Sequence, residues 1–120
     1  MNIEERSGKN IEEGMKYINA ALDIIPGQPQ MLDTRATVHI ALGDHLSAVE
    51  DATSAMKASP NSLSIKITLV KAYILAENFD AARSLLEEIT DKNELSISPS
   101  PAIRNEVEQL ESEIIRSKAA

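Results

Sequence analysis

Cysteine and tryptophan are absent from this chain of 120 residues, and aromatic side chains are limited to one phenylalanine and two tyrosines. The absence of cysteine excludes disulfides, thiolate metal sites and thiol nucleophiles, and it leaves the redox compartment open. With so few aromatics, the core must be built from Ala, Leu, Ile, Val and Met. These residues suit close helix–helix packing better than the two faces of a β-sandwich. The composition therefore predicts an all-α protein.

Positive charge is also scarce, because 12 Lys and Arg residues stand against 19 Asp and Glu residues, for a net charge of −7. Such a field repels phosphate backbones and anionic lipid surfaces, and few aromatics are present to stack on bases. No apolar run approaches the roughly 20 residues that span a bilayer. The first ten residues are mostly polar and include two glutamates, unlike a secretory signal. We therefore expect a soluble protein, cytoplasmic by default, with no nucleic-acid binding and no membrane insertion.

Apolar residues recur at spacings of three and four in six segments, which is typical of amphipathic helices. The predicted helices run over residues 10–25, 30–42, 45–58, 62–76, 79–90 and about 102–117. Asn10, followed by Glu13, resembles a capping box and predicts the start of the first helix. Apolar and polar residues alternate over Leu63–Leu69, as in a strand, but helical spacing continues to Ala76 and favours a helix. Proline, serine and asparagine predict a loop before the last helix.

Residues that begin, end or pack these helices recur every 34 residues. Five sets of positions share this spacing: the caps Asn10, Asp44 and Asn78; the small residues Gly14, Ala48 and Ala82; the stripe residues Ala21, Ala55 and Ile89; the prolines Pro26 and Pro60; and the pair His39 and Tyr73. Five coincidences in one register do not readily arise by chance. The sequence thus predicts a repeated unit of two helices joined by a turn.

The chain resembles the tetratricopeptide repeat family, whose unit is a helix–turn–helix of this length. In the central unit the likeness is carried by Leu32, Ala36, His39, Gly43, Asp44, Ala48, Ala52, Ala55 and Pro60. In the next unit it is carried by Leu69, Val70, Tyr73, Asn78, Ala82, Leu86 and Ile89. Three residues depart from the family pattern: Arg35 replaces a leucine, Lys66 a large aromatic and Glu94 a closing proline. The resemblance covers about 10–91 and implies a right-handed α-solenoid of antiparallel helix pairs with a C-terminal capping helix.

This register divides the chain into an N-terminal tail or truncated helix at 1–9, TPR-like repeats at 10–91, a loop at 92–101 and the capping helix at 102–120. Within the repeats, 10–28 is half a unit, and 29–62 and 63–91 are units. Because the half unit lacks its first helix, an apolar flank of residues 11–25 should be exposed. We expect the chain to be a C-terminal fragment of a longer repeat protein; the alternative is that this flank pairs in a homodimer.

The resemblance further implies that the first helix of each unit lines a concave groove for a peptide or helix. The groove residues in this register are Gln30, Asp33, Thr37, Ile40, Ala41, Ser64, Ile67, Lys71, Ile74 and Leu75. Their spacing places each set on one face of its helix. The alternative interpretation is that the C-terminal helix folds into the concavity and buries them. The sequence does not separate these two interpretations.

Chaperone-binding members of the family hold a C-terminal carboxylate with several cationic or amide residues. Here Asp33, Thr34, Ile67 and Thr68 occupy such positions, and Lys71 alone is too little for that site. His39 and His45 point in different directions on a helix, so no metal site is predicted. No nucleophile accompanies them either. We therefore expect a protein–protein interaction module that is not an enzyme and needs no cofactor; the remaining alternatives are a homodimerising structural domain and a non-catalytic regulatory domain of a larger enzyme.

Overall fold

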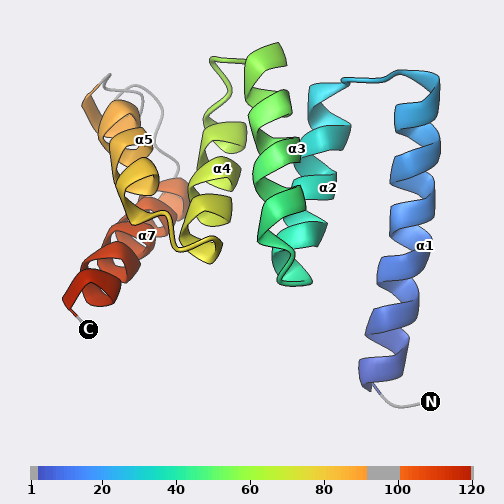
Figure 1. Ribbon diagram of the computed structural model, residues 1–120, viewed down its shortest axis with the longest axis horizontal. Coiled ribbons are helices and arrows are strands. Elements are labelled where there is room, and N and C mark those ends of the chain that lie inside the picture. The colour runs from blue at the N-terminus through green and yellow to red at the C-terminus, as the bar shows by residue number, and fades with distance from the viewer. Residues whose placement is uncertain (1–2, 92–100, 120) are drawn as a thin grey trace.

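The computed structural model describes residues 3–91 and 101–119, with side chains for 10–90 and 101–117, and in these ranges the chain forms helices and no strand. The helices are α1 (Ile3–Ile24), α2 (Pro29–Ala41), α3 (His45–Ala58), α4 (Leu63–Leu75), α5 (Phe79–Asp91) and α7 (Pro101–Ala119). Helices α1 to α5 follow one another in chain order across the molecule (Figure 1), and each of them packs on the next. Helix α7 packs on α5 and α4. None of the helices in the described ranges has the length and apolar character needed to cross a membrane.

The predicted helical class is confirmed, and the bounds of α2 to α5 agree with the prediction to within one residue at each end. Helix α1 is the exception, because it begins at Ile3 and runs through Asn10 without a break. Asn10 is therefore an exposed residue inside the helix, not its cap. The seven residues before it contain no proline, and they include Glu, Arg and Lys, which favour helix. The predicted loop lies outside the described residues except for Pro101, the first residue of α7.

The turn between α2 and α3 closes with a left-handed glycine. Gly43 has φ = 79°, and its N–H donates to the carbonyl oxygen of Ile40 at 3.0 Å. The N–H of Asp44 donates to the carbonyl oxygen of His39 at 2.9 Å. The Asp44 carboxylate then caps α3 by accepting from the N–H of Ser47 at 3.2 Å, and hydrogen bonding with Ser47 lowers the pKa of Asp44. The predicted cap is thus confirmed, and the turn is a C-terminal helix cap followed directly by an N-cap.

The turn between α4 and α5 repeats this hydrogen bonding 34 residues later. The N–H of Glu77 donates to the carbonyl oxygen of Ile74 at 3.0 Å, and that of Asn78 to the carbonyl oxygen of Tyr73 at 2.9 Å. Asn78 caps α5 by accepting from the N–H of Ala81 at 3.4 Å. Glu77 takes the left-handed position of the glycine, with φ = 61°. The 34-residue repeat therefore extends to the individual backbone hydrogen bonds.

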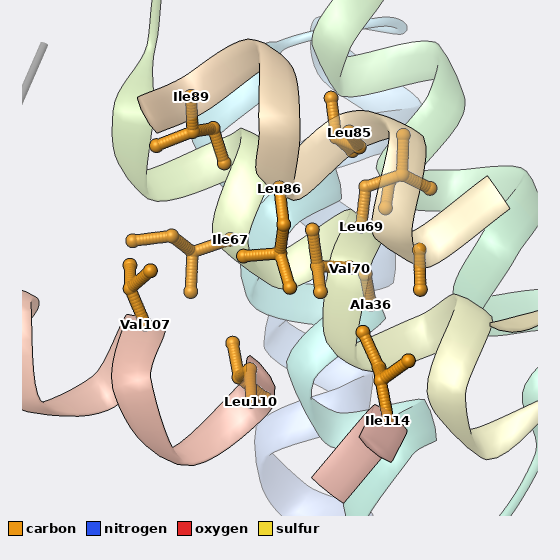
Figure 2. Packing of buried hydrophobic residues seen from close by; sticks show 12 residues of the cluster. Ala36, Ile67, Leu69, Val70, Leu85, Leu86, Ile89, Val107, Leu110 and Ile114 are labelled. Carbon is orange, nitrogen blue, oxygen red and sulfur yellow. The ribbon is translucent and has the colours of Figure 1, made fainter. Parts of the chain in front are cut away.

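Among the described residues, two apolar clusters form the core, and α4 contributes to both. One cluster joins α1, α2, α3 and α4 through Ile18, Leu22, Leu32, Ala55 and Ile65. The other brings together α4, α5 and α7 (Figure 2), and it includes one alanine each from α2 and α3. Residues 65–70 of α4 are all buried, including Lys66. Because α4 packs against helices on several sides, most of its surface is buried, which explains why its sequence is the most apolar of the predicted segments.

Arg35 departs from the family pattern because it forms a paired charge with Asp51 of α3. Its Nε and Nη2 atoms donate to the two carboxylate oxygens of Asp51 at 2.7 and 2.9 Å, and Nη1 donates to Oδ1 of Asn19 on α1 at 3.0 Å. The hydrogen bond to Asp51 raises the pKa of Arg35. In the following repeat, Leu69 and Leu85 occupy the two equivalent positions, and both are buried. A two-pronged ion pair in one repeat thus takes the place of a leucine pair in the next.

Candidate functional site: a groove along α4

One long face of α4 lies between α2 and α7, and two adjoining hollows follow it. The first hollow has a volume of about 260 Å³ and is lined by Asp33, Thr37, Ser64, Ile67, Thr68, Lys71, Ile103 and Glu106. The second has a volume of about 280 Å³ and is lined by Ile40, Lys71, Ile74, Leu75, Leu110 and Glu113. Lys71 borders both hollows, so they run in line along α4. We call the pair of hollows the α4 groove.

The groove has α4 as its floor, α2 as one wall and α7 as the other. On α2, the spacing of Asp33, Thr37 and Ile40 places them on one side of the helix. On α4, Ser64, Lys71, Ile74 and Leu75 extend along the floor over three turns. Eight of the ten residues predicted for a groove line one hollow or both. The other two, Gln30 and Ala41, are exposed near the ends of α2 and line neither hollow.

Helix α7 covers part of the predicted concave face without filling it. Its buried residues Val107, Leu110 and Ile114 belong to the same cluster as Ile67 of α4, and Figure 2 shows Val107 beside Ile67. Ile67 is consequently buried at the bottom of the first hollow. Ile74 is half-buried and still borders the second hollow. Helix α7 thus packs along α4, and the two hollows lie beside it; binding of a partner in the groove stays a prediction.

The α7 side of the groove was not predicted from the sequence. Its lining residues Ile103, Glu106, Leu110 and Glu113 recur at three- and four-residue spacings. This spacing is visible in the sequence and predicts one face of a helix. It does not say which helix that face meets, since the sequence between the two helices predicts no angle between α5 and α7. The sequence thus left open whether α7 docks against α4, and it did not identify the residues of α7 that line the groove.

The groove is more acidic than basic. The ammonium of Lys71 forms an ion pair with Oε1 of Glu106 across the first hollow. Asp33 faces the same hollow, and its Oδ1 atom is buried without a hydrogen-bond partner. Glu113 borders the second hollow. With Lys71 already paired, these lining residues offer no free cation with which to hold a carboxylate.

The two histidines lie away from the groove. His39 is half-buried, with Nε2 3.6 Å from Oδ2 of Asp51 and Nδ1 3.7 Å from Oδ2 of Asp44. This is the packed position predicted for it, beside the Arg35–Asp51 pair that joins α2 to α3. His45 is exposed in the first turn of α3. Within the described residues, no three His, Asp or Glu side chains gather closely enough to hold a metal ion.

Comparison with known proteins agrees with this architecture. The family model of the tetratricopeptide repeat matches residues 39–97, a range that includes the whole of α3, α4 and α5. No curated protein matches the chain. Repeats of this family generally mediate protein–protein interaction. The helix pairs and the duplicated turns agree with this match, which identifies residues 39–97 as tetratricopeptide repeat.

Proposed function

We propose that this chain is a protein–protein interaction module that holds one helix or extended peptide of a partner in the α4 groove. The observation that carries the proposal is the pair of hollows in line on α4, bordered by apolar side chains that α7 leaves uncovered. Ile40, Ile74 and Leu75 are all half-buried there. An apolar strip of this kind, rimmed by polar groups, is typical of a contact surface.

The mechanism is complementarity to a preformed surface. Three helices form the groove. Buried apolar clusters and the Lys71–Glu106 pair join both of its walls to its floor. The module therefore loses little conformational entropy on binding, and the cost of ordering falls on the partner. An apolar side chain in the second hollow would contact Ile40, Ile74 and Leu75 together. This is the helix-in-groove mode of recognition, in which a few anchors on one face supply most of the affinity.

The variant Ile74→Glu tests the groove, with Leu46→Glu as its matched control. Both introduce a carboxylate for an apolar residue, but Leu46 is exposed on α3 and borders neither hollow of the groove. The probe is a set of peptides selected by the wild-type chain from a random 15-residue library. We expect Ile74→Glu to weaken peptide binding at least about tenfold, with a smaller relative change in melting temperature, because a charge in an apolar contact loses its hydration. Leu46→Glu should leave binding unchanged.

Two results would count against the groove. Equal loss of binding in both variants would indicate a general effect of added negative charge. Loss of the fold in Ile74→Glu, with no selective loss of binding at lower temperature, would assign Ile74 to the core. In either case, we expect the amide chemical shifts that change on peptide binding to lie on another face of the molecule.

Self-association through α1 is the second candidate, and the exposure of Tyr17 favours it. The positions 34 and 68 residues later are Asp51 and Leu85, which are 6% and 7% exposed, whereas Tyr17 is 78% exposed. Helix α2 packs on one side of α3. No described helix packs on the equivalent side of α1. Sedimentation over a range of concentrations tests this candidate: a mass that rises with concentration, and that Tyr17→Glu returns to the monomer value, would support it. A strict monomer would remove it.

A further inference from the structure

The first hollow of the α4 groove presents hydrogen-bond acceptors and few donors. The hydroxyl of Thr37 donates to the backbone oxygen of Asp33 at 3.0 Å, and the hydroxyl of Thr68 donates to the backbone oxygen of Ser64 at 3.1 Å. Each threonine has thus used its hydrogen within its own helix, while the lone pairs of its oxygen can still accept. These two residues border the hollow as acceptors, from α2 and from α4.

Asp33 adds one carboxylate oxygen that lacks a partner. Its Oδ1 atom is buried and makes no hydrogen bond. A buried carboxylate oxygen without a donor destabilises a fold, because it has lost its water and gained nothing in exchange. The cation that borders the same hollow, Lys71, is paired with Glu106. The described residues around Asp33 therefore supply no hydrogen-bond donor to its Oδ1 atom.

The charge of the first hollow, like its acceptors, favours a ligand that donates hydrogen bonds. Asp33, Glu106 and Lys71 leave the hollow with a net negative charge, on a chain whose own net charge is −7. A cationic group would be attracted to this site and an anionic tail repelled. A guanidinium offers five N–H donors in a planar fork, which suits several acceptors placed around one space.

We propose that the first hollow binds the guanidinium of an arginine side chain from the partner segment, with Asp33 as its counter-ion. The proposal rests on the α4 groove being the binding site, and it names the chemistry of one anchor. Thr37 and Thr68 accept from the remaining N–H groups, while the apolar hollow on the other side of Lys71 receives an aliphatic side chain. The partner segment is therefore basic and apolar on one face.

Titration with N-acetyl-argininamide, followed by amide chemical shifts, tests the hollow without a known partner. N-acetyl-citrullinamide is the matched probe, because it has nearly the same shape and no charge. We expect argininamide to shift the amide signals of Thr37, Ser64 and Lys71, and citrullinamide to leave them in place. Asp33→Asn should weaken argininamide binding at least about fivefold, since it removes a charge-assisted hydrogen bond. Asp23→Asn, which removes an exposed carboxylate of α1, is the matched protein control and should have no effect.

Equal shifts with both probes, or equal losses in Asp33→Asn and Asp23→Asn, would overturn the proposal. Thr37→Val is a second variant that should keep the fold, because Thr37 is exposed. It removes one acceptor from the hollow and should weaken argininamide binding about twofold to fivefold. The selected peptides separate this proposal from the one it rests on. If they lose affinity for Ile74→Glu and bind Asp33→Asn normally, the groove stands and the arginine site is wrong; if neither variant affects them, both proposals are wrong.

Discussion

Position 77 holds a glutamate in a backbone conformation that glycine occupies one repeat earlier. A left-handed conformation costs an L-residue about 1–2 kcal/mol, because Cβ approaches the next carbonyl oxygen. Glycine avoids this cost but loses about 0.5–1 kcal/mol more backbone entropy on folding. We therefore predict that Glu77→Gly raises the free energy of unfolding by about 0.5–1 kcal/mol, measured by urea denaturation.

The reciprocal change at Gly43 is the control for this prediction. A Cβ added at Gly43 meets no atom within 4 Å, so the cost of Gly43→Ala arises from the backbone alone. We expect it to lower the free energy of unfolding by about 1 kcal/mol. Opposite signs at the two positions would show that the two turns are energetically equivalent. A destabilised Glu77→Gly would mean that the Glu77 side chain contributes more than its strain costs.

The Arg35–Asp51 pair gives a second prediction at the scale of single residues. Arg35→Leu leaves the buried carboxylate of Asp51 without its two-pronged partner and should lower the free energy of unfolding by about 3 kcal/mol. The double variant Arg35→Leu/Asp51→Leu recreates the leucine pair of the next repeat. We expect it to return to within about 1 kcal/mol of wild type or to exceed it. A double variant as unstable as the single one would show that the space between α2 and α3 does not fit two leucines.

At the scale of elements, α7 offers two adjacent isoleucines with opposite surroundings. Ile114 is 3% exposed in the cluster with α4 and α5, whereas Ile115 is 68% exposed. Ile114→Ala should lower the free energy of unfolding by about 2–4 kcal/mol, because it opens a cavity in the main cluster. Ile115→Ala should change it by less than about 0.5 kcal/mol. Both values come from thermal or chemical denaturation, and equal values would mean that α7 does not pack on the repeats in solution.

Elements with clear punctuation could be predicted from the sequence, and those without it could not. Asp44 and Asn78 mark helix starts through side-chain caps, and the structure confirms both. Asn10 has the same residue type at the same spacing, yet no break precedes it, so α1 continues to Ile3. A cap residue alone does not start a helix; the chain must also turn before it.

The groove residues show a second limit of prediction from sequence, which concerns contacts between helices. Periodicity places Asp33, Thr37 and Ile40 on one face of α2, because that relation is local to one helix. The depth at which Ile67 is buried depends on α7, which is distant in sequence and joined through residues 92–100. The charge pairing of Lys71 with Glu106 is likewise a tertiary contact. Local spacing thus identifies candidate lining residues, while burial and electrostatics depend on how the helices dock.

At the scale of the whole molecule, stability should be graded along the stack. Helix α4 packs on α2, α3, α5 and α7, whereas the principal contact of α1 is with α2 alone. In repeat proteins each element is stabilised mainly by its neighbours, so an end element with one neighbour opens at lower free energy than a central one. We predict that native-state hydrogen exchange is slowest in α4, over Thr68–Ala72, and at least about 100-fold faster in α1, over Glu12–Met15. Ile18→Ala provides the internal comparison, because it removes a buried contact of α1 with the rest of the core and should speed exchange in α1 with a much smaller effect in α4. Equal protection of the two helices, or equal effects of Ile18→Ala on both, would show that α1 and the repeats unfold as one cooperative unit.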